Sequence, residues 1–552
     1  MNHDAPRFER FTFTSLVALL LGPVVAQASW RSLGHVLGVT GDARALTGAA
    51  LAIALAGTLP RAVRPGLVAP LAVGVIVALG AAGALSLGVA GMLALVGVAV
   101  TTALLAHGLP AQLPVALEGL ARRRPRFTAL YGLLALASLA SVARVSVFMG
   151  DATHVEMQVL PGERFLQTHS CLSAYVRADV LVRRRVDNLY DTRWWEGPDG
   201  QPLHPVEPDD PYRPFVLDYY AYPPPFLLLV TPLTPFHGDF AAQRALWFGL
   251  NALLLAVGLA WVARRVEGPG AHRVVLLAPI FFACLPVLAT LQVGNFQIAV
   301  VMISILAMVA FARGRDAAGG ALLALAILSK ISPGLLAVLL LAQRRWRALA
   351  WTALFGVLLL ALSAALFGVG PLRSFVVYLL PRLSSGEAFA FLDDAPFSIA
   401  TNMSPFGLPF KLRMMGLHVG DPWNVARHLG RAYTLALVVV IALAARRPRG
   451  DLRHQAVVWM SLLILGALQS PFAPGYTFIA LLWATTLLAA DVRTVAQGAS
   501  LALLWVGLTV APPWHAEALV AAQSVLQSML ALAVPTWLIL RRLPTDHASP
   551  RA

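Results

Sequence analysis

The side chains that could do chemistry in this sequence are few, and Lys330 is the first of them. It is the first lysine of the chain and lies in the stretch LSKISPG, between two apolar runs. Proline opens a helix more readily than it continues one, so Pro333 predicts two half-helices, about 317–329 and 333–343, with Lys330 at the tip of their hairpin. A lysine is costly in lipid, so Lys330 faces a water-filled cavity or an anion, or extends to the outer headgroups.

Carboxylates form the second group, directly after an apolar run at 127–149. Asp151, Glu156 and Glu163 could act as a general base, ligate a metal, or remain solvated loop charges. With His154 they form the pattern D-x-x-H-x-E, but the sequence offers no further ligands at a fixed spacing. A divalent metal is therefore left open, and no ligand set is predicted.

Composition defines what must position these residues. The chain is 58% hydrophobic and 12% charged, with a mean hydropathy of +0.72. Its apolar runs are about 17–25 residues long, the length of a membrane-spanning helix, and they lack the alternation of a membrane barrel. We therefore expect an all-α polytopic transmembrane bundle. The net charge of +15 lies in short clusters between these runs, so the positive-inside rule explains it before nucleic-acid binding does.

Basic clusters set the expected topology. Placing them inside puts both termini in the cytoplasm and two polar segments, about 150–221 and 371–430, on the outer face. The stretch SCLSAYVRADVLVRRRV in the first segment has the pattern of an amphipathic helix lying on a membrane surface. Its arginines, Arg177 among them, could bind lipid phosphates. Whether the proline-rich run 222–236 crosses the membrane stays open.

Several motifs recur in a fixed order between about residues 150 and 490. They are A-x-x-L with N-L-Y (Ala178 to Tyr190), YPPPFLLLVTPL (Tyr222 to Leu233), Pro286-Val287 with the turn Gly294 to Gln297, the run Gly319 to Leu349 around Lys330, and TNMSPFGL with QSPFAPGY. Together they resemble glycosyltransferase family 87 of the GT-C superfamily. These are membrane enzymes that use polyprenyl-phosphate-sugar donors and include mannosyltransferases. The resemblance implies accessory helices over 1–126, a catalytic core over 127–490 and terminal helices with a short tail over 491–552.

The resemblance also implies roles for residues. Lys330, with the helix start at Ser332, would neutralise the donor phosphate. The motif residues Tyr222, Asn295, Gln297 and Asn402 are expected to bind substrate.

One position departs from the pattern. The family usually carries an aspartate about seven residues before the alanine that matches Ala178, as the base for the acceptor hydroxyl, and this chain has Cys171 there. Three explanations are open. The base has moved to Asp151, Glu156 or Glu163; or the alignment with the family is shifted; or the activity is lost or changed.

The function implied is a multi-pass enzyme of the plasma (inner) membrane. It would transfer a hexose, mannose-like, from a polyprenyl-phosphate donor to a lipid or glycan acceptor at the outer face. A flippase or transporter would also use broken helices and buried charges. An outer-face polymerase or ligase of lipid-linked glycans, or a non-catalytic scaffold, are the other readings. No motif predicts a nucleic-acid partner.

Overall fold

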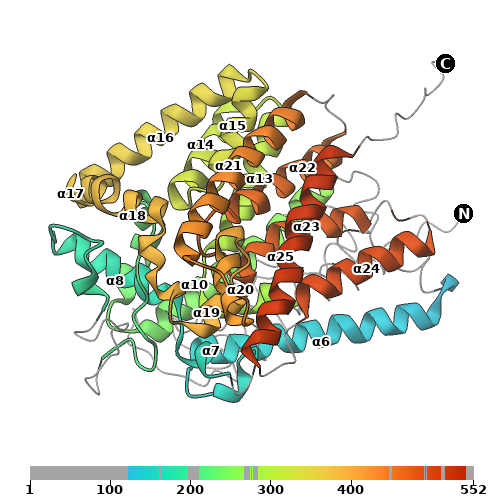
Figure 1. The fold of residues 1–552 in the computed structure, drawn as a ribbon, viewed down its shortest axis with the longest axis horizontal. Helices are drawn as coiled ribbons and strands as arrows, with labels where there is room; N and C mark the ends of the chain where they lie inside the picture. The colour runs from blue at the N-terminus through green and yellow to red at the C-terminus, as the bar shows by residue number, and fades with distance from the viewer. Residues whose placement is uncertain are drawn as a thin grey trace, which may run out of the picture. The chain divides into compact units, whose positions relative to one another are not determined.

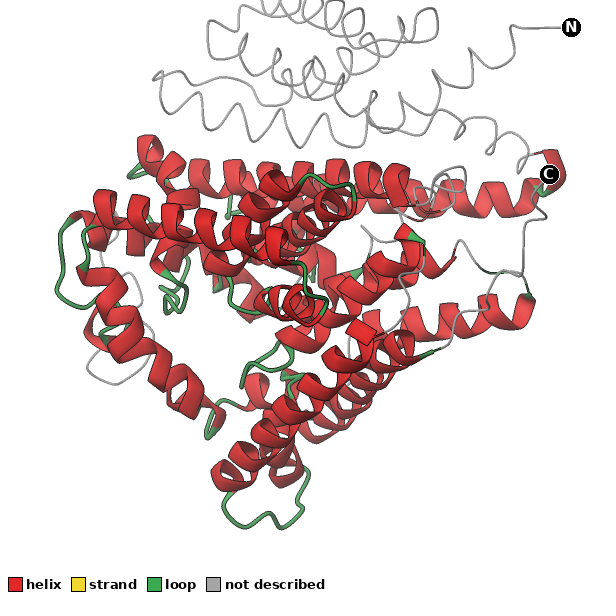
Figure 2. Ribbon diagram, turned by 90° about the horizontal axis from the view of Figure 1, so that it is seen from above, coloured by secondary structure: helices red, strands yellow, loops and turns green. Residues whose placement is uncertain are grey.

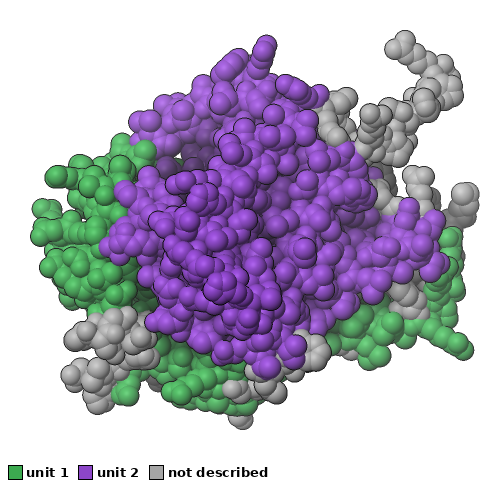
Figure 3. All heavy atoms as spheres, in the orientation of Figure 1, with its two compact units in different colours: residues 1–302, 359–379 green, residues 303–358, 380–552 purple. Residues whose placement is uncertain are grey.

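The structure is a computed structural model of the chain. It describes residues 122–160, 163–196, 210–266, 274, 277, 284–446, 451–489, 492, 494–510 and 516–541. Three expected parts of the chain lie outside these residues. They are the accessory helices within 1–126 except their last few residues, the first part of the apolar run 273–291, and most of the C-terminal tail. The chain divides into two compact units, coloured in Figure 3: residues 1–302 with 359–379, and residues 303–358 with 380–552.

All regular elements of the described residues are helices (Figure 2). Five of them are long and apolar enough to cross a membrane: Phe240–Ala263, Trp346–Phe367, Gly370–Leu392, Pro422–Arg446 and Glu517–Leu540. A sixth span arises if the bent pair Leu285–Val293 and Gln297–Ala312 counts as one. This confirms the all-α, polytopic membrane fold expected from the composition.

The first unit is built on two long helices, α6 (Pro125–Gly150) and α10 (Phe240–Val266), which pack on each other and on α12 (Leu285–Val293). The polar segment between α6 and α10 contains short elements: η1 (Val155–Met157), α7 (Arg164–Thr168), α8 (Cys171–Arg183), η2 (Thr192–Trp194), η3 (Pro224–Phe226), α9 (Leu227–Val230) and η4 (Thr231–Phe236). Prolines remove backbone donors within 223–235, so this run forms short helical turns. At 13 residues, Pro224–Phe236 is too short to cross a membrane as a straight helix.

A sharp bend joins α12 to α13 (Gln297–Ala312), whose axes differ by 109°. Gly294 ends α12 in the left-handed region, with φ of +71°. A Cβ there would lie 3.3 Å from the Trp247 ring, whose Nε1 donates to the Gly294 carbonyl at 2.7 Å. Glycine is therefore favoured by both backbone conformation and space. Asn295 then caps α13 by accepting from the Gln297 N–H at 3.0 Å.

The second unit contains the predicted broken pair, α14 (Asp316–Ser329) and α15 (Gly334–Ala342), with Lys330 in the break. The far ends of the two helices meet. Asp316 at the start of α14 lies 3.9 Å from Arg345 and 3.6 Å from Arg347, which follow α15. The arrangement is a hairpin with Lys330 at its tip, as the position of Pro333 predicts.

The rest of the second unit is a helical bundle in which α25 packs against α19, α20, α21, α22 and α24 (Figure 1). Its elements, and those preceding it, are α16 (Trp346–Phe367), α17 (Gly370–Ser374), η6 (Phe375–Leu379), α18 (Leu380–Ser385), η7 (Glu387–Leu392), α19 (Pro396–Thr401), η8 (Pro405–Gly407), α20 (Leu408–Met414), α21 (Pro422–Arg446), α22 (Leu452–Ala467), η9 (Gly475–Phe478), α23 (Ile479–Leu488), α24 (Val495–Thr509) and α25 (Glu517–Leu540). Of these, α16, α17 and η6 extend into or lie in residues of the first unit.

Two sequence expectations differ from the structure. The helix expected to lie on the membrane surface is α8, and ten of its 13 residues are buried inside the protein. Its pattern of polar residues was misleading because Asp179 pairs with Arg183 at 2.8 Å, which lets a carboxylate be buried. The second outer segment, expected at 371–430, begins with helical residues 370–392 that are themselves apolar enough to span a membrane.

Candidate active site

Cys171 begins α8, immediately after a short extended stretch. His169 and Ser170 both have extended backbones, with φ of −98° and −149°. Residues two apart in an extended chain point to the same side. His169 and Cys171 therefore face the same space, and the His169 Nε2 lies 3.6 Å from the Cys171 Sγ.

A distant segment brings a carboxylate to this histidine. The Val216 N–H donates to the Thr168 carbonyl at 2.8 Å. The Ser173 hydroxyl, one turn into α8, donates to the Val216 carbonyl at 2.9 Å and accepts from the Asp218 N–H at 3.1 Å. These bonds hold 216–218 alongside the start of α8. As a result the Asp218 Oδ1 lies 3.3 Å from the His169 Nδ1.

Two residues from the sequence motifs complete the group. The Asn295 Nδ2 lies 3.4 Å from the Cys171 Sγ and 3.4 Å from the Tyr222 hydroxyl. The Tyr175 hydroxyl donates to the Tyr222 hydroxyl at 2.9 Å. We call His169, Cys171, Asp218, Tyr222 and Asn295 the Cys171 cluster; all five belong to the first unit.

Aromatic rings pack against the Tyr222 side of the cluster. Tyr222 stacks on Phe226 at 5.0 Å, and Tyr175 meets Tyr222 edge to face at 5.1 Å. Phe226 in turn contacts Trp247 and Phe296. The YPPPF motif is thus the rigid base that orients the Tyr222 hydroxyl. The His169 and Asp218 side chains are 21% and 28% exposed, so solvent reaches the cluster at these two residues.

The charges in the cluster favour a protonated histidine. Burial by itself lowers the pKa of His169, but its electrostatic interactions with Asp218 and Cys171, and its hydrogen bonds to both, outweigh burial. The net result is a His169 pKa raised well above its usual value. An imidazolium here can donate an N–H to each of its two neighbours.

His169, Cys171 and Asp218 also offer ligand atoms that lie within 4.8 Å of one another. A thiolate, an imidazole and a carboxylate form a donor set that zinc accepts. However, the two ring nitrogens of His169 face different partners, whereas a bound ion needs one nitrogen and both other groups to face a common point. The arrangement is that of a hydrogen-bonded chain from carboxylate through imidazole to sulfur.

The acids expected from sequence lie in the turns that follow α6. Asp151 Oδ1 accepts from the Thr153 N–H and hydroxyl at 3.0 and 2.7 Å. His154 lies 3.9 Å from Asp151 and 3.3 Å from Glu156. Glu163 caps α7 by accepting from the Phe165 N–H at 3.4 Å. These hydrogen bonds and ion pairs are local, although Asp151 also interacts electrostatically with Arg244 of α10. The carboxylates of Glu156 and Glu163 are exposed.

The expected phosphate-binding residues lie in the second unit. The Lys330 Nζ lies 4.7 Å from the centre of the Tyr476 ring, within the QSPFAPGY motif. The LSKISPG loop also approaches α22 closely, because a Cβ on Gly466 would lie 3.0 Å from the Ser332 carbonyl. The LSKISPG and QSPFAPGY motifs therefore lie together in the second unit. The Ser332 hydroxyl is buried and has no hydrogen-bond partner among the described residues.

Of three other expected binding residues, two bond to protein backbone, and one has a side-chain oxygen with no hydrogen bond from the described residues. Asn402 is fully buried, and its amide bonds to the Pro471 carbonyl and to the N–H groups of Ser404 and Ala473. Arg177 donates to the Trp194 carbonyl at 2.9 Å. Gln297 is buried, and its side-chain oxygen has no partner among the described residues.

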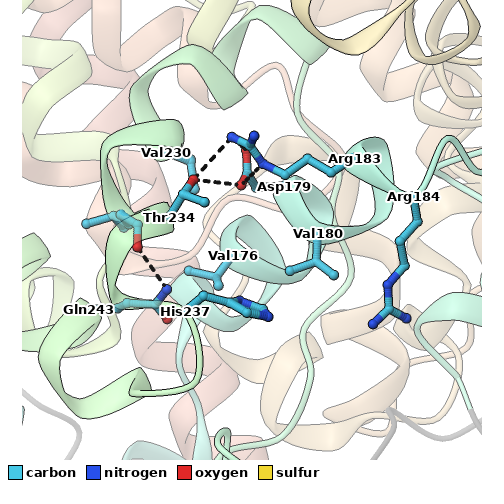
Figure 4. Close-up of a pocket in the computed structure, with 10 residues that line it drawn as sticks. Val176, Asp179, Val180, Arg183, Arg184, Val230, Thr234, His237 and Gln243 are labelled. Carbon is cyan, nitrogen blue, oxygen red and sulfur yellow. Dashed lines mark hydrogen bonds and ion pairs between the residues drawn. The ribbon is translucent and has the colours of Figure 1, made fainter. Parts of the chain in front are cut away.

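A pocket of about 300 Å³ lies beside α8, lined by Val176, Asp179 and Val180 of that helix and by Thr234, His237 and Gln243 (Figure 4). Figure 4 shows Arg183 turned back onto Asp179 and Thr234. This arginine is therefore held by protein groups. No residue of the Cys171 cluster lines this pocket, so the pocket and the cluster are separate features of the first unit.

Sequence reasoning missed His169 and Asp218. His169 stands two residues before Cys171 in THSCLSAY, where only a replacement carboxylate was sought. Asp218 stands four residues before Tyr222, in LDYYAYPPPF. The position of Asp218 shortly before the YPPPF motif was the feature of the sequence that could have identified it. Its pairing with residue 169 depends on the Ser173 bonds, which have no sequence pattern.

A family-model match covers much of the range in which the motifs lie. Residues 220–471 match the family model described as Glycosyltransferase family 87, a family of GT-C-like membrane glycosyltransferases. This range contains Tyr222, Asn295, Lys330 and Asn402, and it excludes His169, Cys171 and Asp218. No curated protein matches the chain. No solved structure matches it either.

Proposed function

We propose that this protein transfers a hexose from a polyprenyl-phosphate-sugar donor. The basis is that the chain belongs to glycosyltransferase family 87 and is a membrane glycosyltransferase. The acceptor is a lipid or glycan at the outer face of the plasma membrane. Mannose is the first sugar to test, since the motif resemblance includes mannosyltransferases.

One observation carries this proposal beyond the family match. Tyr222 and Asn295 come from two separate motifs. The Asn295 Nδ2 lies 3.4 Å from the Tyr222 hydroxyl and 3.4 Å from the Cys171 sulfur. Residues of two motifs thus converge on a group of titratable side chains. Such a convergence of ionisable groups outside the spanning helices is typical of a catalytic centre.

The chemistry required is modest. The donor already carries a phosphate leaving group, so the protein must bind that phosphate, stabilise its growing charge and accept one proton from the acceptor. We assign phosphate binding to Lys330, with Ser332 beside it, because a lysine ammonium is a compact point charge suited to phosphate. Proton acceptance is assigned in the next subsection, and Asp151, Glu156 and Glu163 are the alternatives predicted from sequence.

The test is sugar transfer by the full-length protein in membrane vesicles, with radiolabelled polyprenyl-phosphate-mannose and polyprenyl-phosphate-glucose. Lys330→Ala is expected to lower the transfer rate at subsaturating donor about 10- to 100-fold, the loss expected for a charge-assisted contact. Lys330→Arg keeps the charge and should retain more transfer. Arg427→Ala removes an exposed basic residue of the same unit and should leave transfer unchanged.

Two results would count against the proposal. The phosphate role fails if Lys330→Ala transfers as well as Lys330→Arg. The transferase assignment fails if the vesicles move lipid-linked sugar across the bilayer and form no new glycosidic bond, which is the outcome for a flippase.

A further inference from the structure

We infer that Asp218 is the general base of the proposed reaction and that His169 is the positioning residue that holds it. The inference rests on the function proposed above. It assigns the proton transfer to two residues outside the range matched by the family model, in a chain whose expected base position is occupied by Cys171.

The position of Asp218 is fixed without the help of its own carboxylate. Its backbone N–H is bound to the Ser173 hydroxyl at 3.1 Å, and Ser173 also holds the Val216 carbonyl at 2.9 Å. The Val216–Thr168 backbone bond adds a third constraint. A general base needs such constraint, because proton transfer requires its oxygen within hydrogen-bond reach of the acceptor.

The carboxylate itself has one oxygen engaged and one available. Oδ1 lies 3.3 Å from the His169 Nδ1. Oδ2 accepts no hydrogen bond from the residues that the structure describes, and the side chain is 28% exposed. Asp151 contrasts with it because both of its oxygens have neighbours: Oδ1 receives two bonds from Thr153, and Oδ2 lies 3.9 Å from the His154 Nε2. Asp218 thus presents a free acceptor oxygen in a fixed orientation.

His169 has the features of a positioning group. Its ring is stacked on Phe165 at 4.4 Å and lies between two partners, Asp218 on one nitrogen and Cys171 on the other. With its pKa raised well above the usual value, the ring stays protonated at neutral pH and donates to Asp218. The charged or titratable groups that face this pair are Cys171 and Tyr222, with the neutral amide of Asn295 beside them.

The step balances as follows. The acceptor oxygen bonds to the anomeric carbon of the sugar while the bond from that carbon to the phosphate oxygen breaks, and the electron pair stays on the phosphate. The acceptor proton passes to the Asp218 Oδ2. The products are the glycoside, a polyprenyl phosphate with one more negative charge, and a neutral Asp218 carboxyl that returns its proton to water.

The decisive variants are isosteric. Asp218→Asn keeps the shape of the side chain but cannot accept the proton, and we expect kcat to fall about 100-fold or more. Asp218→Glu retains a carboxylate and should transfer faster than Asp218→Asn. His169→Gln should lower kcat per folded molecule about 10-fold with the donor KM unchanged within twofold. The folded fraction is measured separately, because misfolded protein also lowers the apparent kcat without changing KM. Asp187→Asn, an exposed acid of the same segment, is the matched control.

A second measurement does not depend on transfer. The ring of His169 can be titrated by NMR in protein labelled at histidine, with the signal assigned from His169→Gln. Wild type should show a raised pKa that falls in Asp218→Asn. If wild type transfers no sugar from either donor, the proposed function fails, whereas this titration still decides whether the Asp218–His169 pair exists.

Four outcomes would overturn the inference. Transfer by Asp218→Asn within threefold of wild type would remove Asp218 as the base, as would a loss that follows Asp151→Asn, Glu156→Gln or Glu163→Gln. An unchanged His169 titration in Asp218→Asn would show that the pair is not formed. One equivalent of bound zinc, lost in both Cys171→Ser and Asp218→Asn, would identify the residues as metal ligands.

Discussion

Cys171 and Asn402 mark two regions in which polar side chains join segments that are far apart in the sequence. Around Asn402, one amide holds 402–404 to 471–473 through bonds of 2.8, 3.0 and 3.0 Å, all to backbone groups. We call this the Asn402 joint. Around Cys171, the bonds instead run between side chains, and His169 and Asp218 are 21% and 28% exposed.

The difference distinguishes a structural role of polar side chains from a chemical one. Both polar atoms of the Asn402 side chain bond to backbone groups, which is a structural role. The Cys171 cluster keeps an oxygen of Asp218 available and places ionisable groups in contact, which is the condition for perturbed acid–base behaviour. Three predictions can break or sharpen this contrast.

Asn402→Ala should have the largest effect. It leaves the Pro471 carbonyl and two buried N–H groups without their partner, at about 1–3 kcal/mol for each unsatisfied group, so we expect a loss of roughly 4 kcal/mol in unfolding free energy. Thermal unfolding in detergent measures it. Sugar transfer per folded molecule should change little, and a selective loss of transfer at wild-type stability would give Asn402 a role in binding.

Lys411 should show an intermediate effect. It is buried in α20, and burial lowers its pKa to about 7. The unfolded chain, with the ordinary value of about 10.5, binds more protons between these limits, so stability rises as pH increases from about 7 toward 10. The slope is about 1.4 kcal/mol per pH unit.

The variant for this prediction is Lys411→Met. It should be more stable than wild type at pH 7, and this advantage should shrink by about 2 kcal/mol at pH 9, as measured by thermal unfolding at each pH. A constant difference between the two proteins would show that Lys411 is charged in the folded state.

Ser173→Ala should have the smallest effect on stability and a specific effect on transfer. It removes the hydroxyl that binds Val216 and Asp218, at a cost of about 1 kcal/mol. Because Asp218 then loses one of its constraints, we expect transfer to fall about 5- to 10-fold, roughly equal to that energy. Parallel unfolding and transfer assays measure both, and unchanged transfer would show that Asp218 is positioned without Ser173.

The sequence predicted the elements whose cause is local. Apolar length gave the spanning helices, and Pro333 with Lys330 gave the hairpin of α14 and α15. The buried state of α8 was not predictable, since the bonds from Thr231 and Thr234 to Asp179 and the packing against α9 are tertiary contacts. The Asp218–His169 pair has the same origin: it joins residues 49 positions apart through contacts that leave no periodic signal.

The Asn402 joint also bears on how the chain is made. The Asn402 amide lies 69 positions before the Pro471 carbonyl that it binds. At roughly 5–20 residues per second, a ribosome needs about 3–14 s to add that length. During this interval the Asn402 amide lacks its bonds to Pro471 and Ala473, so the joint forms only after α22 and the residues that follow it have been synthesised. A pause in translation within this window would prolong the time during which 402–404 is open to chaperones.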